Sequence, residues 1–231
     1  MTEAASARRD ERGRPLPPPL APAERTVGQL VAESIRLYGG RFWAVLPLGL
    51  SVALLDQLLR GREQWLWLVA MLTVGALALT ASYTAACLLV LRMRPSPGRI
   101  ALAYAIGVLA FLPFPLLMLG FVLPGVAWLA LVGLAVPVAL AEPLGLRGSF
   151  RRAVALARAD YVHALGSLAT LVIVYFLTRT VLVLLLRGQG EQTERIAFFL
   201  ADLVLSPLVF LGSALLYVDQ AARLDSADPR R

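Results

Sequence analysis

Six long apolar runs dominate the chain, and short segments with charged and turn-forming residues separate them. A helix needs about 20 mostly apolar residues to cross the hydrocarbon core of a bilayer. Backbone polar groups in lipid must bond within their own segment, so each run predicts a membrane-spanning α-helix. We expect an all-α integral membrane protein with six transmembrane helices. They lie near residues 42–60, 65–91, 100–120, 122–142, 161–186 and 196–218.

The third and fourth spans come from one uncharged run, because no charged residue lies between Arg99 and Glu142. At about 1.5 Å of rise per residue, this run is about two bilayer crossings long. Gly120, Pro124 and Gly125 favour a tight turn near its middle. We expect this turn to join two antiparallel helices.

Two segments that precede spans are amphipathic and too polar to cross a membrane. In the first, Thr26 and Gln29 have the spacing of a capping box that starts a helix. In the second, apolar side chains recur at intervals of three and four residues, with arginines off this stripe. The apolar set is Leu146, Phe150, Val154, Ala157 and Tyr161. The arginines are Arg147, Arg151, Arg152 and Arg158. We expect both segments to be interfacial helices, and these arginines to contact anionic lipid headgroups.

The two amphipathic segments align with an offset of 119 residues, which pairs Val31 with Phe150. Between them, the segment SPGRIALAYAIGVLAFLPF starts a third copy, in which Ser96 can cap a helix and Pro97 suits its first position. We therefore expect three hairpins of two spans, each preceded by an amphipathic interfacial helix. The alternative is that any two basic amphipathic segments resemble each other.

Composition agrees with the membrane class, since 58% of the residues are hydrophobic and 16% are charged. Soluble domains have roughly 45–50% and 25%. The formal net charge is +7, and all basic side chains are arginines, which indicates a GC-rich bacterial genome. The arginines lie between apolar runs and not on one soluble face. The expected anionic partner is therefore a membrane surface and not a nucleic acid.

Arginine placement predicts the orientation, because positive side chains are retained on the cytoplasmic side of a membrane. Most arginines lie in the N-terminal region, the second and fourth loops and the C-terminal tail. We expect a protein of the bacterial cytoplasmic (inner) membrane with both termini in the cytoplasm. Residues 1–25 lack the apolar core of a signal peptide and predict a disordered cytoplasmic tail. A membrane domain at 26–223 and a second tail at 224–231 follow.

Three charged residues fall inside the predicted spans when the end residue of each span is left out. Arg179 in the fifth span and Asp202 in the sixth are expected roughly 10 Å below the outer interface, and Asp56 lies near the outer end of the first span. An unpaired charge at the centre of a bilayer costs roughly 2.5–3.5 kcal/mol, which predicts an ion pair between helices. Either the pair only fixes helix register, or it forms a site for an anionic headgroup or solute.

Residues that could carry catalysis are few. Cys87 lies in an apolar run and predicts a small core residue, and His163 is expected in the membrane interface. Glu142 and Asp219, at the cytoplasmic ends of the fourth and sixth spans, are expected to form ion pairs with nearby arginines. These partners are Arg147, Arg158 or Arg223. The sequence has no zinc-ligand spacing, phosphate-binding glycine loop or serine with a base, so we expect no enzyme, metal or cofactor.

Three segments together resemble a known membrane domain. They are TVGQLVAESIRLYGGRFWAVLPL, LPGVAWLALVGLAVPVALAEPLGLRGSFRRAVALARADY and LLYVDQAAR. From about residue 26 to residue 223 the chain is similar to the membrane domain found with some bacterial glycerophosphodiester phosphodiesterases, and to related six-pass membrane proteins. The phosphodiesterase activity of those proteins belongs to a soluble barrel domain, so the resemblance implies no catalytic residue here. The chain departs from the familiar ending at Ala221, where an arginine is usual and Arg223 is the nearest match.

Two functions are consistent with the sequence. The first is a non-catalytic membrane module that organises anionic lipids or partner proteins. The second is a small transporter or lipid translocator with a site at Asp56, Arg179 and Asp202. A water-filled cavity that reaches Arg179 would favour the second function. A dry, directly bonded pair of Arg179 and Asp202 would count against it.

Overall fold

The computed structural model describes residues 21–226, and every regular element in this part of the chain is helical. Six segments are long and apolar enough to cross a membrane. They are Phe42–Leu59, Gln64–Leu91, Pro97–Leu117, Val122–Ala141, Tyr161–Leu185 and Glu191–Ser226. The expected all-α, multi-pass architecture is confirmed, and most spans begin and end within a few residues of their expected positions.

Two amphipathic helices precede spans, α1 (Val27–Gly40) and α10 (Leu146–Ala159). Both have 14 residues, and the offset that aligns them in the sequence relates both of their ends. The Thr26 hydroxyl accepts a hydrogen bond from the Gln29 N–H, and the Gln29 side chain accepts one from the Thr26 N–H, as a capping box requires. The middle hairpin has no separate helix before it, because its first span begins at Pro97 directly after a short loop.

The first span changes helix type along its length. It begins as α2 (Phe42–Val45), continues as the 3₁₀ helix η2 (Leu46–Gly49) and ends as α3 (Leu50–Leu59). Pro47 lies in the 3₁₀ helix. A proline has no N–H and disfavours the interior of a regular α-helix, which explains the change of type at this point.

The second span also changes helix type within the membrane. It consists of α4 (Gln64–Ala70), a π-helical turn (Met71–Gly75) and α5 (Ala76–Leu91). π-Helical turns inside α-helices are rare and occur frequently at functional sites. Ser82 of α5 donates a hydrogen bond to Ser51 of α3 over 2.9 Å, which joins the first two spans inside the bundle.

The third and fourth spans form a hairpin of four short helices. They are α6 (Pro97–Phe111), α7 (Phe114–Leu117), α8 (Val122–Val132) and α9 (Ala135–Ala141). Pro124 and Gly125, expected in the turn, lie instead in the first turn of α8, and the chain reverses at residues 118–121. Proline fits there because the first N–H groups of a helix lack intrahelical partners. Gly125 is buried against Met118, so its small size serves packing.

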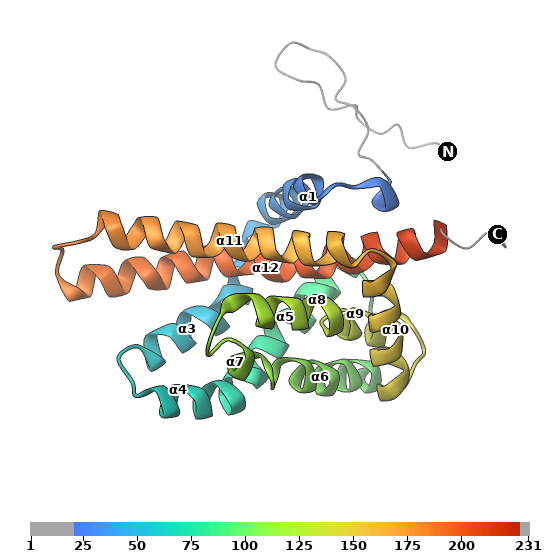
Figure 1. The fold of residues 1–231 in the computed structure, drawn as a ribbon, viewed down its shortest axis with the longest axis horizontal. Coiled ribbons are helices and arrows are strands. Elements are labelled where there is room, and N and C mark those ends of the chain that lie inside the picture. Colours follow the sequence, from blue (N-terminus) through green and yellow to red (C-terminus); the bar gives the residue numbers. More distant parts are fainter. Residues whose placement is uncertain (1–20, 227–231) are drawn as a thin grey trace, which may run out of the picture.

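The last two spans, α11 (Tyr161–Leu185) and α12 (Glu191–Ser226), form the longest hairpin. It extends beyond the α6–α9 hairpin at the end where residues 186–190 join its two helices (Figure 1). At about 1.5 Å per residue α12 is about 54 Å long, which exceeds the ~30 Å hydrocarbon core of a bilayer. α12 continues to Ser226, past residue 223 where we expected the membrane domain to end.

The core of the molecule is built around α12, which packs against α11, α5, α3 and α1. α1 lies across α11 and α12 on the side opposite α5 and α6 (Figure 1). Gly49 at the end of η2 lies directly on the backbone of Leu203, so a methyl group at this position would overlap the α12 backbone. Gly212 similarly leaves room for Leu171 of α11. Close backbone approach at small residues is the usual way in which membrane helices associate.

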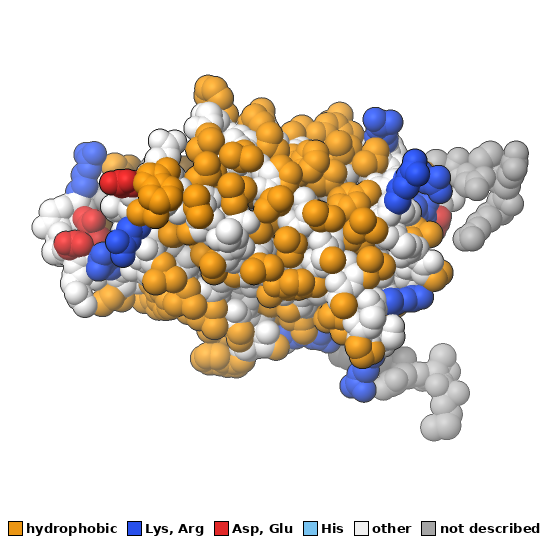
Figure 2. Space-filling view, turned by 90° about the horizontal axis from the view of Figure 1, so that it is seen from below, with side chains coloured by type: hydrophobic (Ala, Val, Ile, Leu, Met, Phe, Trp, Pro, Cys, Tyr) orange, Lys and Arg blue, Asp and Glu red, His pale blue; other side chains and the backbone are white. Residues whose placement is uncertain are grey.

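The surface has the pattern of a membrane protein. Figure 2 shows a broad hydrophobic band with charged side chains gathered at its two ends. The first and last segments that the structure describes lie together at one end of this band. Arg223 there donates a hydrogen bond to the carbonyl of Arg25. We call this end, which also carries α10 (Figure 1), the arginine-rich end. Most of the expected tails, residues 1–20 and 227–231, lie outside the described residues, whereas residues 22–24 form the short 3₁₀ helix η1.

Candidate functional site

The three charged residues expected inside the membrane lie together, toward the end of the molecule opposite the arginine-rich end. One Nη atom of Arg179 on α11 lies 3.0 Å from Asp202 Oδ1 on α12. Its other Nη atom lies 3.0 Å from Asp56 Oδ1 on α3. The Asp202 side chain is fully buried, whereas the side chains of Arg179 and Asp56 are 21% and 23% exposed. A single guanidinium therefore bridges carboxylates from two different helices.

Two further polar side chains complete this group, which we call the charge cluster: Asp56, Arg60, Tyr175, Arg179 and Asp202. The Tyr175 hydroxyl donates a hydrogen bond to Asp202 over 2.6 Å and accepts one from Arg179 over 3.1 Å. Arg60 donates a hydrogen bond to Asp56. The cluster holds two carboxylates and two guanidinium groups, so its formal charges cancel. This cancellation explains how an apolar span accommodates an arginine.

Phe198 of α12 lies beside both guanidinium groups of the charge cluster. The Arg60 guanidinium carbon is 4.5 Å from the centre of its ring, and that of Arg179 is 5.1 Å away. The negative faces of aromatic rings attract cations, most strongly where water is excluded. The ring therefore stabilises the two positive charges in addition to their carboxylate partners.

Tyr175 and Arg60 were not expected in this cluster, although the sequence carries a signal for both. Tyr175 precedes Arg179 by four residues, and Arg60 follows Asp56 by four. This spacing places side chains on the same face of a helix. Phe198 carries no comparable signal, because it reaches the cluster only through the packing of α12 against its neighbours.

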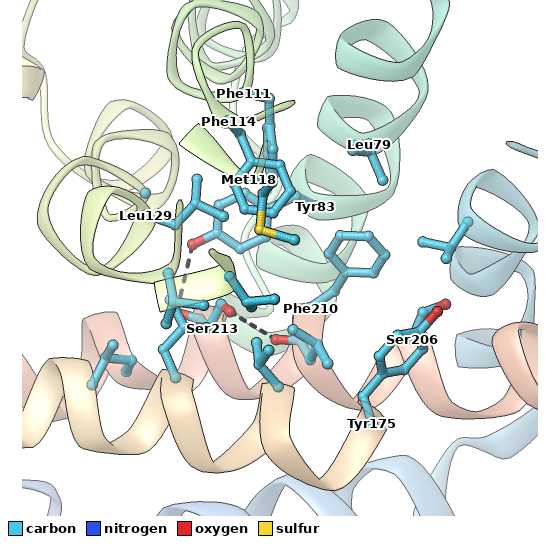
Figure 3. Close-up of a pocket in the computed structure, with 18 of the residues that line it drawn as sticks. Leu79, Tyr83, Phe111, Phe114, Met118, Leu129, Tyr175, Ser206, Phe210 and Ser213 are labelled. Atoms are coloured by element: carbon cyan, nitrogen blue, oxygen red, sulfur yellow. Dashed lines mark hydrogen bonds between the residues drawn. The ribbon is translucent and has the colours of Figure 1, made fainter. Parts of the chain in front are cut away.

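An apolar cavity of about 230 Å³ adjoins the charge cluster inside the bundle (Figure 3). Its walls come from all six spans and from Met118 in the turn between the third and fourth spans, and Tyr83, Phe111, Phe114 and Phe210 are among the aromatic side chains that line it. Tyr175 and Ser206 belong both to the cavity wall and to the surroundings of Asp202, since each forms a hydrogen bond with that residue. Arg179 itself does not line the cavity.

The four arginines expected to contact lipid all lie on α10, which runs across the ends of the spans (Figure 1). Arg147, Arg151 and Arg158 are exposed. Arg152 instead forms an ion pair with Glu142 over 3.2 Å. It takes the place of Arg147 or Arg158, the partners that we expected for Glu142, because a carboxylate at the end of α9 lies beside the part of α10 that carries Arg152.

The buried face of α10 is shifted from the expected apolar stripe. Its buried residues are Ser149, Ala153, Leu156 and Ala157. Leu146, the first residue of the expected stripe, is 45% exposed, and Phe150 and Val154 are half-buried. Small residues let α10 pack closely on α8, α9 and α12. The larger apolar side chains therefore lie at the border between the protein and its surroundings.

The arginine-rich end holds a second group of paired charges. Asp219, fully buried, forms an ion pair with Arg25 over 3.0 Å, so the expectation that Arg223 would be its partner is wrong. Arg223 pairs with Asp160 over 2.8 Å. The expected interfacial histidine, His163, is 8% exposed and lies 4.0 Å from Asp219. These contacts tie the segment before α1 to the ends of α10, α11 and α12.

Groups with catalytic or metal-binding potential are few in the described part of the chain. Cys87 is completely buried, as expected of a core residue. Within residues 21–226, no three His, Cys, Asp or Glu side chains lie close enough together to hold a metal ion. The charge cluster and the apolar cavity are therefore the two features inside the membrane that call for a functional explanation.

No protein-family model, no curated protein and no solved structure matches this chain.

Proposed function

We propose that this protein is a non-catalytic module of the bacterial cytoplasmic membrane that organises anionic lipids, and through them or directly partner proteins, at the cytoplasmic face. Both termini then lie in the cytoplasm, together with α10. The observation that carries the proposal is α10, which presents Arg147, Arg151 and Arg158 to the surroundings across the ends of the spans. Basic side chains at a membrane surface attract anionic headgroups with about 1 kcal/mol each.

The same proposal gives α1 and α10 a common role as interfacial helices, each leading into a hairpin. Their equal length and their constant offset support this plan for the first and third hairpins. It is also consistent with the resemblance to the membrane domain of glycerophosphodiester phosphodiesterases, in which the catalytic activity resides in a separate domain.

The alternative, a transporter or lipid translocator with its site at the charge cluster, receives less support. Arg179 is bonded directly to Asp56 and Asp202, and its guanidinium is not part of the wall of the apolar cavity. An anionic substrate would have to displace one of two carboxylates from a neutral cluster. These two ion pairs are consistent with a structural role, in which they fix how α3, α11 and α12 are aligned along their axes.

The proposal is tested by removing the exposed charges of α10. We expect the triple variant Arg147→Gln, Arg151→Gln, Arg158→Gln to bind phosphatidylglycerol on the order of 100-fold more weakly, because three surface interactions of about 1 kcal/mol each are lost. Binding of phosphatidylcholine should not change. Native mass spectrometry of the purified protein during lipid titration measures both affinities.

In a matched control, three exposed arginines at the opposite end are replaced by glutamine in the same way. They are Arg62, Arg187 and Arg195. This variant has the same net charge as the α10 variant. It should retain the affinity for phosphatidylglycerol. If both triple variants lose affinity equally, net charge and not α10 controls lipid binding, and the proposal is wrong.

A further inference from the structure

The apolar cavity has no polar group left to satisfy. Four hydroxyl groups line it, and each already has a partner within the protein. Tyr83 donates to the carbonyl of Ser213 over 3.5 Å, and Ser213 donates to that of Val209 over 2.7 Å (Figure 3). Ser206 and Tyr175 both donate to Asp202, at 2.6 Å. An enclosed water needs two to four polar partners, so the chemistry of the wall selects an apolar occupant.

The cavity is also large enough for a substantial apolar group. An apolar cavity of about 150 Å³ accommodates a benzene molecule in another protein. The volume here, about 230 Å³, exceeds that value by roughly half. Close-packed interiors rarely leave such space, because every missing contact loses dispersion energy. The cavity is therefore more than an ordinary packing defect.

Helix irregularities from three spans converge on this cavity. Met71 opens the π-helical turn of the second span and lines the wall. Phe111 and Phe114 flank the interruption between α6 and α7, and Gly133 and Leu134 form the interruption between α8 and α9. Non-helical backbone within a membrane is tolerated where it is buried in protein or lines a cavity. These irregularities together shape the space.

The cavity opens toward the lipid-facing surface. Its rim includes Phe176 of α11, which is 41% exposed, and the half-buried Met118 and Val122 beside the turn at residues 118–121. Around this rim the exposed side chains are apolar. They include Leu119, Phe121, Ile173 and Leu177. An occupant therefore enters from the hydrocarbon of the bilayer and not from water.

We propose that this cavity binds one hydrocarbon chain of a membrane lipid, which enters between α11 and the turn at residues 118–121. The inference rests on the proposed lipid-organising function and adds a chain-binding site to it. Tyr175 forms part of the wall on the side of the charge cluster, so the bound chain lies next to that cluster. The bound chain replaces the side-chain contacts that the cavity lacks.

Photolabelling locates the chain directly. The protein is reconstituted in phosphatidylcholine that contains a small fraction of phosphatidylcholine with a diazirine near the end of one acyl chain. After irradiation, mass spectrometry maps the modified residues. We expect adducts on cavity residues such as Met71 and Phe210, in addition to the residues that face lipid everywhere. Adducts confined to outward-facing residues such as Ile173 and Leu177 overturn the proposal.

Two variants of α11 provide a matched comparison. Val172 lines the cavity near its rim, whereas Val174 is 37% exposed and does not line it. Val172→Trp should lower cavity adducts about tenfold, the change expected when roughly two buried methylene groups of the chain lose their place. Val174→Trp should leave them unchanged. Equal cavity labelling in both variants contradicts the proposal.

If Val172→Trp does not fold, the adduct map of the unaltered protein still locates the chain. Val209→Phe then serves as a second variant, because it fills the cavity from α12. Phosphatidylcholine has no net charge, so this experiment does not depend on headgroup binding by α10. Cavity labelling can therefore fail while the α10 variants behave as expected, and the reverse is equally observable.

Discussion

At the scale of single residues, the structure shows how an apolar helix carries an arginine. Arg179 has a carboxylate on each of two neighbouring helices and a tyrosine hydroxyl within hydrogen-bond distance. Asp56 has a second partner in Arg60, whereas the buried Asp202 has only Arg179 and Tyr175. The two carboxylates thus depend on Arg179 to different degrees. Loss of Arg179 leaves Asp202 as the less compensated charge.

We expect Arg179→Leu to lower the free energy of unfolding by about 3–5 kcal/mol, because it leaves the buried Asp202 carboxylate without its charged partner. The double variant Arg179→Leu, Asp202→Leu should lose less, since it removes both members of the pair and leaves Asp56 bonded to Arg60. Thermal unfolding in detergent compares the two variants.

The control for this comparison is Arg195→Leu. Arg195 lies near the same end of the molecule and pairs with Glu191, but both side chains are largely exposed. Exposed pairs contribute little, so its effect should stay below about 1 kcal/mol. If the single and double variants at Arg179 and Asp202 are destabilised equally, the pair does not act as the structure suggests.

At the scale of helices, glycines determine how closely the spans approach α12. η2 contacts the α12 backbone at Gly49, and α11 contacts α12 where Gly212 admits Leu171. Without a hydrophobic driving force between helices in lipid, such close contacts supply much of the association energy. The irregular second, third and fourth spans are consistent with this arrangement, because they enclose the cavity while α12 stays continuous.

Gly49→Ala should destabilise the protein by roughly 1–3 kcal/mol or more, because a methyl group there overlaps backbone atoms of Leu203 that cannot rotate away. Gly39→Ala is the matched control, since nothing lies within 4 Å of a methyl group at that position in α1. It should leave stability unchanged or raise it by about 0.5–1 kcal/mol, as expected for alanine in a helix. Equal unfolding temperatures for the two variants would contradict the close η2–α12 contact.

At the scale of the whole molecule, the distribution of charge suggests an orientation. The arginine-rich end carries α10 and both described ends of the chain, whereas residues 60–63 and 186–190 lie at the other end. With six spans, an even number, the two ends of the membrane domain lie on the same side. Because positive charge is retained in the cytoplasm, we expect α10 and both termini to lie inside the cell.

Thiol labelling of intact cells tests this orientation. Ser96→Cys, in the loop between α5 and α6, should be protected from a membrane-impermeant reagent, and Gln189→Cys, in the loop between α11 and α12, should be labelled. Background labelling should be low, because the natural Cys87 is completely buried. Labelling of position 96 but not of position 189 would reverse the proposed orientation.

Much of the architecture was predictable from the order of residues alone. Each apolar run of about 20 residues must satisfy its backbone within lipid, and a helix does so locally, so the six spans needed no tertiary information. The capping box at Thr26 and Gln29 was predictable for the same reason. The cost of isolated charges in lipid also indicated that Arg179, Asp202 and Asp56 would meet, because their heights in the membrane follow from helical rise.

Other features depended on packing between helices and could not be read from the chain. Pro124 and Gly125 are typical turn residues, yet the reversal occurs before them, and Gly125 instead packs against Met118 within α8. Glu142 pairs with Arg152, and Asp219 pairs with Arg25, because the packing of the helices brings these side chains together. The cavity has no sequence signal at all, since its walls are ordinary apolar residues. Their side chains enclose space only after the other five spans, some of them interrupted, have packed around α12.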